Sequence, residues 1–442
     1  MTKRDGVYPL HGRTRLIKMG IAAFSTVRKS KMQKAALVVA ILFSFILTPA
    51  NSFASNPVEG AKAAGMGTAV VAVADDPSAI AHNPAGLVQL KGTNIYGGMT
   101  FVIPSTTYTS PSGQSEDTEF QIFFPPHLYF SSDLGTKDMR FGIGIFSPFG
   151  IGGAKWSREG LTRYCSTESM IATLAINPTF AYQVLPSLSV GIGLNYMISR
   201  TQAKRMVDQS IFGADDGEII LKGIGDGWGY NLGLLFTPDK RLSLGFAYRS
   251  RIKVTHDGDI EFKHIAPALQ DSFGGSDFET DMHTPSTFPE IISFGIAYRP
   301  SERLTFELDL ERVGWSSFKS ADLDLEDEVP SANFSDSLTP LDWEDTWLIK
   351  VGAEYRLNES LALRGGYVYV ETPVPDPTLD AANPNAVQHN FCIGLGYKIK
   401  KLVIDFFYNA GFHEDRKVKN EILSGEYENF IHSFGFSIGK KF

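Results

Sequence analysis

The sequence predicts an all-β fold, namely a transmembrane antiparallel β-barrel of about fourteen strands. From Gly92 to the last residue, amphipathic strands alternate with short turns and long polar loops. The final strand, Ser433–Phe442, carries its apolar residues at even positions, and Phe442 keeps that register. Lipid offers no hydrogen-bond partner, so a spanning sheet must close on itself, with apolar residues outward and polar or small residues inward.

The N-terminus reads as an export signal. The apolar run Ala35–Leu47 is too short for a spanning helix. It follows a basic stretch and precedes a small-x-small cleavage site, so we expect residues 1–54 to be an extension plus signal peptide, cut after Ala54. Met32, just before the basic stretch ends, is the expected start. The alternative is an N-terminal membrane anchor.

Composition narrows the function classes. The chain has 42 Gly, 32 Phe and 16 Tyr, as expected of strands with aromatic girdles and small lumen residues. Residues 1–54 hold nine Lys/Arg and one Asp, so their removal takes the formal net charge from −8 to about −16. An acidic exported protein is a poor candidate for nucleic-acid binding. Cys165 lies in an expected loop and Cys392 on an expected strand facing the lumen, so no disulfide is expected between them.

Six tight turns separate runs of period-two alternation. In one run, Leu304, Phe306, Leu308 and Leu310 share a face, while Glu307 and Asp309 occupy the other. Acids on the second face cannot meet lipid, so that face must line water or a polar lumen. The turns are expected at 133–135, 185–187, 238–240, 300–302, 358–360 and 398–401.

Seven long polar segments lie between these hairpins. Short turns on one side and long loops on the other is the arrangement of outer-membrane barrels, with both termini in the periplasm. Six turns and seven loops give fourteen strands over residues 92–442. The loops are expected at 104–119, 148–168, 205–217, 257–286, 315–343, 372–387 and 414–427.

Residues 55–91 do not alternate. Asp76 can cap a helix with Pro77 at its first position, and Asn83 precedes a proline, which should end that helix. A compact segment at this end of a barrel either hangs below it or folds into the lumen as a plug. A barrel of about fourteen strands is wide enough to need a plug unless it is an open porin.

The stretch Ala74–Leu87, which reads ADDPSAIAHNPAGL, resembles the N-terminal hatch of the FadL/TodX-type outer-membrane transporters of long-chain fatty acids and hydrocarbons. The runs Phe141–Gly150, Arg364–Tyr367 and Glu371–Asp376 also resemble this family. The resemblance implies a barrel with a hatch over residues 55–91 inside the lumen. It also implies passive uptake of hydrophobic compounds, long-chain fatty acids or aromatic hydrocarbons, released sideways through a kinked third strand. The hatch residues it indicates are Asp75, Asp76, Pro77, Asn83, Pro84 and Ala85.

Prolines beside the second and third strands predict a weak place in the wall, because proline removes ladder hydrogen bonds. With the turn centred near Leu134, Pro125 and Pro126 are expected opposite Gly144 and Ile143. A lateral opening then involves these residues; the alternative is an ordinary β-bulge without a role in transport. The residues assigned to the opening are Pro125, Pro126, Gly144, Pro148 and Gly150. By resemblance, Asn83–Ala85 approaches the third strand near Pro148.

Basic residues are candidates for holding a carboxylate head group. Six of them share the expected lumen face, and the alternative is that they balance lumen acids such as Glu307, Asp309 and Glu354. Aromatic and basic residues of the second long loop are candidates for an outer capture site, with plain loop solvation as the alternative. The lumen set is Arg140, Arg249, Arg251, Arg299, Lys350 and Arg364; the loop set is Lys155, Trp156, Arg158, Arg163 and Tyr164.

No catalytic motif, phosphate loop or paired histidine motif is evident, so no cofactor, metal or enzymatic activity is expected. A barrel hydrolase with dispersed catalytic residues and an adhesin or porin without a plug are the alternatives from other classes. The expected partners are hydrophobic small molecules, outer-membrane lipid and lipopolysaccharide. The assembly machinery is expected to read the C-terminal Phe442, and the protein is expected to act as a monomer.

Overall fold

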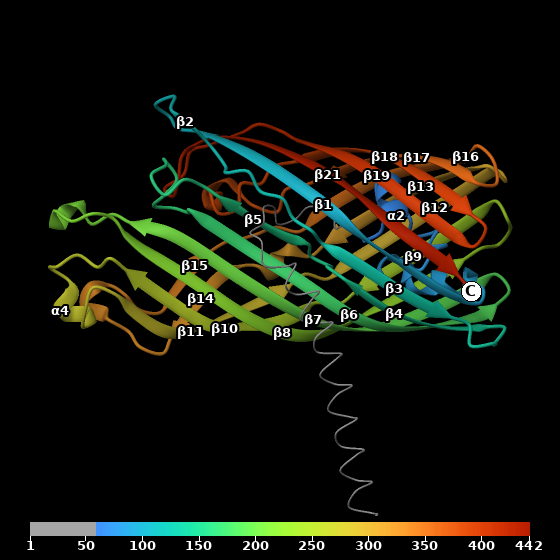
Figure 1. Ribbon diagram of the computed structural model, residues 1–442, viewed down its shortest axis with the longest axis horizontal. Helices are drawn as coiled ribbons and strands as arrows, with labels where there is room; N and C mark the ends of the chain where they lie inside the picture. The colour runs from blue at the N-terminus through green and yellow to red at the C-terminus, as the bar shows by residue number, and fades with distance from the viewer. Residues whose placement is uncertain (1–58) are drawn as a thin grey trace, which may run out of the picture. The chain divides into compact units, whose positions relative to one another are not determined.

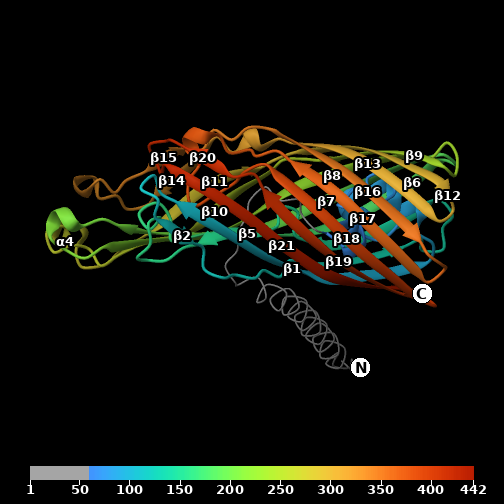
Figure 2. The ribbon, with the colours of Figure 1, turned by 90° about the horizontal axis from the view of Figure 1, so that it is seen from above.

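The computed structural model describes residues 59–442, so the expected start, signal peptide and cleavage site lie outside the described residues. Within that range, fourteen antiparallel strand positions close into one barrel (Figures 1 and 2). Around the ring, β1 pairs with β3 on one side and with β21 on the other, which closes the sheet. Seven positions consist of two pieces each: β2 with β3, β4 with β5, β9 with β10, β11 with β12, β13 with β14, β15 with β16, and β19 with β20. The predicted barrel and its strand count are therefore confirmed.

The strands are given in chain order. They are β1 Thr93–Thr109, β2 Ser115–Asp117, β3 Pro126–Ser132, β4 Met139–Phe146, β5 Ile151–Lys155, β6 Glu168–Leu185, β7 Leu188–Val207, β8 Gly217–Phe236, β9 Leu242–Arg249, β10 Ile252–Lys263, β11 Phe278–Phe288, β12 Ile291–Ser301, β13 Leu304–Val313, β14 Ser320–Leu325, β15 Ser337–Pro340, β16 Thr346–Arg356, β17 Leu361–Val370, β18 Gln388–Ile399, β19 Leu402–His413, β20 Arg416–Val418 and β21 Gly425–Lys441. Short helices are α2 Ala61–Gly65, α3 Ala79–His82 and α4 Gln270–Phe273, with 3-10 turns η1 Pro84–Gln89, η2 Ser210–Phe212, η3 Trp315–Ser317, η4 Pro330–Ala332 and η5 Asp376–Thr378. Within residues 59–442, no helix has the length and apolar character needed to cross a membrane.

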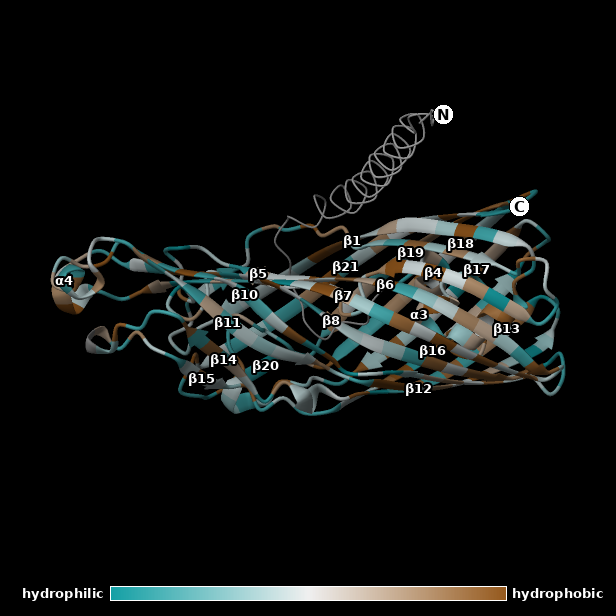
Figure 3. Ribbon diagram, turned by 90° about the horizontal axis from the view of Figure 1, so that it is seen from below, coloured by the Kyte–Doolittle hydropathy of each residue, from teal (hydrophilic) through white to brown (hydrophobic). Residues whose placement is uncertain are grey.

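The side-chain alternation matches the two expected environments. On β13, Phe306, Leu308 and Leu310 are about half exposed, whereas Glu307 and Asp309 are 2% and 0% exposed. Brown and teal alternate along the strands in Figure 3 for this reason. Outward apolar residues match lipid, while inward polar residues must be paired inside the barrel.

Five of the six tight turns lie where they were predicted, between consecutive paired strands, and the sixth, expected at 133–135, is a longer connection over residues 133–138. The start of β1 and the end of β21 lie at the same end of the barrel, since Asn94 pairs with Lys441 and the Phe442 N–H donates to the Thr93 carbonyl at 2.9 Å. We call this the turn end, and the opposite end the loop end.

The loops expected at 148–168 and 315–343 contain the short strands β5, β14 and β15, and the loop expected at 257–286 is much shorter than predicted. Most of 257–286 is strand, because β10 and β11 pair from Ile252↔Phe288 to Phe262↔Phe278 and leave only residues 264–277 between them. The solvent-facing positions of β10 and β11 carry acids and histidine. These strands therefore lack the apolar face by which a lipid-facing strand is recognised in the sequence. The hairpin extends at the loop end and carries α4 (Figure 1).

The N-terminal segment, residues 59–91, lies within the ring of strands, and α2 is seen there in Figure 1. Helix α2 contacts β17, β18, β19 and β21, whereas η1 contacts β4, β6, β7 and β8 on another part of the wall. The expected helix is present but begins two residues later, at Ala79 with Ser78 as N-cap; the Asp76 carboxylate accepts from Ser78 N at 2.7 Å in the turn before it, and the helix ends at Asn83 as expected. This segment is thus positioned to obstruct the lumen.

Candidate functional site

The first half of the N-terminal segment is held to the wall through its backbone N–H groups. Val70 N and Val71 N donate to Asp309 Oδ2 at 2.8 and 3.1 Å. Ala72 N and Val73 N donate to the two oxygens of Glu307 at 2.5 and 2.9 Å. Two adjacent inward carboxylates of β13 therefore accept four consecutive buried donors that have no partner inside the segment.

The second half is held mainly through its carbonyl oxygens. Asn231 Nδ2 donates to the Ile80 carbonyl at 3.0 Å, and Arg249 Nη2 donates to the Ala81 carbonyl at 3.0 Å. The Asn83 amide donates in addition to the Leu234 carbonyl of β8 at 3.0 Å. Its oxygen accepts from Ala85 N, which explains why asparagine stands at the start of η1.

Glycines on the strands let the segment approach the wall closely. An added Cβ at Gly366 of β17 would lie 2.3 Å from Gly67 N, and one at Gly233 of β8 would lie 2.2 Å from Asn83 Oδ1. Both distances are far below van der Waals contact, so only glycine fits at these places.

The structure corrects the expected position of Asn83–Ala85. These residues do not lie against the third strand near Pro148; Pro84 and Ala85 pack on Gly191 of β7 and, with Asn83, on Gly233 of β8. The third strand is instead met by Ile80, whose side chain would contact a Cβ at Gly142 or Gly144 at 2.7–2.9 Å. The sequence motif identified the right segment but could not tell which wall each residue faces.

The expected register of the second and third strands is also wrong, by four residues. Gly144 pairs with Tyr129, and Ile143 pairs with Phe130, rather than with Pro125 and Pro126. The connection after β3 is longer than a tight turn, because the Asp133 carboxylate accepts from Gly92 N and Gly135 N and shapes a turn of six residues, 133–138.

The wall is nevertheless interrupted beside the prolines. The β3–β4 ladder ends at Leu128↔Ile145, and the next backbone bond between these two positions is Glu119 N to the Lys155 carbonyl at 2.8 Å. In the part of the chain that the structure describes, no backbone hydrogen bond joins residues 120–127 to 146–154. Pro125, Pro126, Pro148 and Gly150 fall within these stretches, whereas Gly144 lies in the paired part.

An aromatic cluster that the sequence did not reveal fills the lumen between the interruption and the loops. The Phe149 ring lies 4.9 Å from Phe288 and 6.5 Å from Trp315, measured between centroids. Trp315 lies 5.4 Å from Trp343 and 5.6 Å from Phe318. These rings belong to one buried core that reaches Ile80 and Phe146. The signal available in the sequence was the placement of two of the five tryptophans at the ends of one polar loop.

Most of the candidate basic residues are paired with acids. Trp156 is buried under the loop that follows β17, and its Nε1 donates to the Ala381 carbonyl at 2.8 Å. Arg140 donates to turn carbonyls and to Leu90, and Arg299 donates to Ser243 Oγ at 2.8 Å. The ion pairs are Lys155 with Glu119, Arg158 with Glu218, Arg163 with Asp216, Arg251 with Glu290, Lys350 with Glu311, and Arg364 with Glu354 and Asp405.

Arg249 differs from these residues. Its guanidinium lies 5.4 Å from the centre of the Phe146 ring, at the base of the aromatic cluster. Its Nη1 lies 3.6 Å from Glu59 Oε1, and neither atom makes a hydrogen bond. Both residues line a buried cavity of about 40 Å³ together with His82 and Lys350. Arg249 is thus a buried cation with one donor still unused, next to an apolar core.

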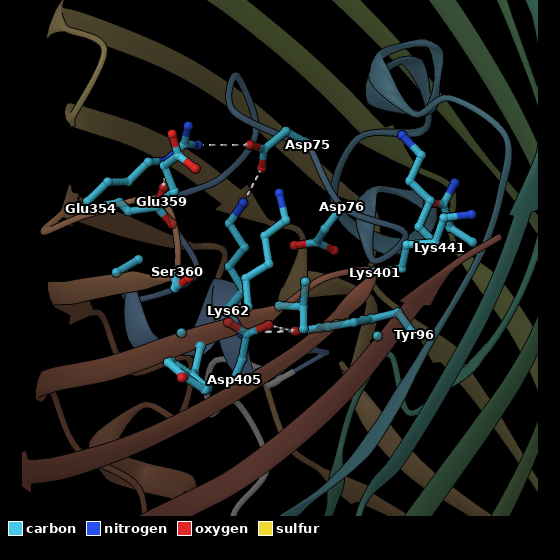
Figure 4. Close-up of a pocket in the computed structure, with 18 of the residues that line it drawn as sticks. Lys62, Asp75, Asp76, Tyr96, Glu354, Glu359, Ser360, Lys401, Asp405 and Lys441 are labelled. Atoms are coloured by element: carbon cyan, nitrogen blue, oxygen red, sulfur yellow. Dashed lines mark hydrogen bonds and ion pairs between the residues drawn. The ribbon is translucent and has the colours of Figure 1, made fainter.

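A larger cavity of about 920 Å³ opens at the turn end, below the N-terminal segment (Figure 4). Its ceiling is polar: Lys62 Nζ meets Asp75 Oδ1 at 2.5 Å, and Tyr96 OH donates to Asp405 at 3.1 Å. Arg364 joins Asp405 to Glu354 at 2.7 and 2.8 Å. This network ties α2 to β1, β16, β17 and β19.

Cys165 and Cys392 are both free, as expected, and Cys392 Sγ faces Asn409 in the interior. Among residues 59–442, no three side chains of His, Cys, Asp or Glu gather so as to hold a metal ion.

Comparisons with known proteins agree with this architecture. Residues 43–442 match the family model described as outer membrane protein transport protein (OMPP1/FadL/TodX). The chain is 23% identical to the long-chain fatty acid transport protein of Escherichia coli O6:H1, over 89% of this chain and 93% of that protein. It is 21% identical to outer membrane protein P1 of Haemophilus influenzae, over 76% and 80% of the two chains.

Two solved structures share the fold. A Pseudomonas aeruginosa FadL homologue superposes with a TM-score of 0.79 at 17% identity, covering 88% of this chain and all of the other. The Pseudomonas putida toluene transporter TodX superposes with a TM-score of 0.68 at 18% identity, covering 83% and 94%.

Proposed function

We propose that this chain, which belongs to the outer membrane protein transport protein family (OMPP1/FadL/TodX), takes up long-chain fatty acids. The family consists of transport channels rather than enzymes, and the chain is accordingly an outer-membrane transporter of hydrophobic compounds. The finer choice, a fatty acid rather than an aromatic hydrocarbon, rests on Arg249.

The observation that carries this choice is the unused donor of a buried arginine beneath an apolar core. A long-chain acid has an apolar tail, which suits the aromatic rings, and a carboxylate, which suits a guanidinium. Arg249 lies against Phe146 at the point where the aromatic cluster meets the N-terminal segment. An aromatic hydrocarbon could make only a cation–π contact with this guanidinium, which is weaker than a charge-assisted hydrogen bond from Arg249 to a carboxylate.

The transport route follows from the same geometry. Loop side chains, including the paired residues Lys155, Arg158 and Arg163, form the outer approach to the aromatic cluster. Residues 59–91 act as a hatch, and its second half lies beside the interrupted wall. The solute then leaves sideways between residues 120–127 and 146–154 into lipid, so its tail never crosses water. A simple bulge without transport remains the alternative role of the interruption.

An aromatic hydrocarbon is the second candidate substrate. The cluster of Phe149, Phe288, Trp315 and Trp343 offers ring faces and edges to another ring. One solved relative is named a toluene transporter. The cluster alone does not separate the two substrate classes, and Arg249 is the feature that supports the acid.

Uptake of labelled oleate and labelled toluene by a deletion strain that expresses the protein tests this choice. We expect oleate uptake, its loss in Arg249→Gln, and unchanged uptake in the matched control Arg303→Gln at the turn end. Surface expression and heat-modifiable migration establish that each variant is folded. Toluene uptake without oleate uptake would overturn the proposal in favour of the second candidate.

A further inference from the structure

Three buried polar atoms without hydrogen-bond partners belong to residues that line the 40 Å³ cavity beside Arg249. They are Glu59 Oε1, His82 Nε2 and Arg249 Nη1. Buried polar atoms are normally satisfied, so unsatisfied ones gathered around one cavity indicate a ligand position. The cavity is large enough for a group of a few heavy atoms, such as a carboxylate or two water molecules.

Of the two cations that line the cavity, Lys350 is paired with an acid, whereas Arg249 is not fully paired. Lys350 Nζ is 3.1 Å from Glu311, which in turn accepts from Ser293 at 2.8 Å. Burial lowers the pKa of His82 to about 3, so its ring is neutral at ordinary pH. Arg249 therefore faces only Glu59, at a distance of 3.6 Å without a hydrogen bond.

We propose that Glu59 is a place-holder carboxylate. It occupies, beside Arg249, the position that the carboxylate of a fatty acid takes, and so sets the preference of the channel between acids and neutral amphiphiles. This inference rests on the proposed function. The Glu59 backbone is fixed, because its carbonyl accepts from Tyr129 OH at 2.9 Å, whereas its Oε1 is held by no hydrogen bond. The Glu59 side chain is thus the group that the substrate carboxylate can displace from Arg249.

The exchange conserves charge if Glu59 takes up a proton when the substrate carboxylate arrives. Burial, the largest cause, raises the pKa of Glu59 to about 7, and Glu311 adds to the rise; Arg249 and Lys350 oppose it. Protonation of Glu59 near neutral pH is therefore easy. A fatty acid with a carboxyl pKa of about 4–5 stays ionised in that range. The substrate carboxylate should consequently compete best with Glu59 for Arg249 just below neutral pH.

The test uses purified full-length protein and a matched pair of ligands, oleate and oleyl alcohol, which share one alkyl chain. At pH 8, where Glu59 is mostly ionised, we expect Glu59→Gln to bind oleate roughly tenfold more tightly than wild type, because a competing charged partner of Arg249 is gone. Binding of oleyl alcohol should not change. Between pH 6 and pH 8 the wild-type affinity for oleate should fall, while that of Glu59→Gln should stay level. Glu359→Gln, an exposed turn residue, is the matched control.

The outcomes separate this inference from the proposed function. Equal changes for acid and alcohol, or no change for either, would overturn the place-holder role while oleate uptake and its dependence on Arg249 stand. Failure of the wild type to bind oleate would overturn both. Glu59→Ala gives the same predicted acid-to-alcohol shift and serves where the glutamine variant does not fold.

Discussion

The two halves of the N-terminal segment are held by opposite chemistry. Residues 61–73 present N–H groups to wall acceptors, above all the carboxylates of Glu307 and Asp309. Residues 80–90 present carbonyl oxygens, which accept from Asn231, Arg249 and Arg140. The first half donates four consecutive N–H groups to two carboxylates, whereas the second half accepts single bonds from separate side chains, so the first half is the more firmly anchored.

The walls behind the two halves differ as well. Residues 61–69 of the first half pack on β16 to β19, where the strands pair without a break, while Val71 and Ala72 lie against β9 and β12. The second half packs on β4, β7 and β8, and Ile80 lies against the strand that borders the interruption. A firmly held half on a continuous wall and a less firmly held half beside a gap imply that a hatch would move at residues 79–90.

The largest expected effect breaks the anchor of the first half. The double variant Glu307→Leu/Asp309→Leu leaves four N–H groups of residues 70–73 buried without partners, at roughly 1–3 kcal/mol each. We expect these amides to lose protection in hydrogen-exchange mass spectrometry, while residues 79–82 keep most of theirs. Glu302→Leu on an exposed turn is the control. Full protection of residues 70–73 in the double variant would show that the carboxylates are not the anchor.

The next effect concerns the wall beside the second half. Pro126→Val and Pro148→Val return two backbone N–H donors to strands that lack a ladder there. We expect the pair to lengthen the β3–β4 ladder and to lower oleate uptake severalfold, with hydrogen exchange of residues 70–73 unchanged. Pro300→Val, at a turn, is the matched proline control. Undiminished uptake in a correctly folded double variant would mean that the solute does not leave through this gap.

A smaller effect distinguishes the alanine substitutions of Gly144 and Gly150. A Cβ at Gly144 would lie 2.9 Å from Ile80 Cγ2, whereas one at Gly150 meets nothing within 4 Å. We expect Gly144→Ala to speed hydrogen exchange of residues 79–82. Gly150→Ala should cost only about 1 kcal/mol, since its φ is +76°, and should leave that exchange unchanged. Equal effects of the two substitutions would contradict the contact between Ile80 and the third strand.

Sequence reasoning succeeded where a local rule determines the structure. The turn signals and the period of two predicted the six hairpins at the turn end, though not the β14–β15 hairpin, and Glu307 and Asp309 could be assigned to the inner face because lipid excludes acids. It failed where the outcome depends on distant partners. The register beside Pro126 depended on the length of the Asp133 turn. The wall faced by Asn83 depended on the fold of the whole N-terminal segment, which alternation cannot reveal.

The pairing of Arg249 with Glu59 shows the same limit. The two residues are far apart in the sequence, and Glu59 lies outside the ADDPSAIAHNPAGL stretch that identified the segment. Likewise, the rings of the aromatic cluster come from four separate connections and strands, so no single window of sequence contains them.

The smallest expected effect lies at the turn end, where the first half meets water. Asp75 pairs with Lys62 at 2.5 Å, but its side chain is 28% exposed and faces the 920 Å³ cavity. Solvent screens such pairs, so Asp75→Asn should lower stability by less than about 1 kcal/mol. The melting temperature should fall by at most a few degrees, and by less at high salt. A loss as large as that of the Glu307/Asp309 variant would show that the polar ceiling of the cavity, rather than β13, anchors this half.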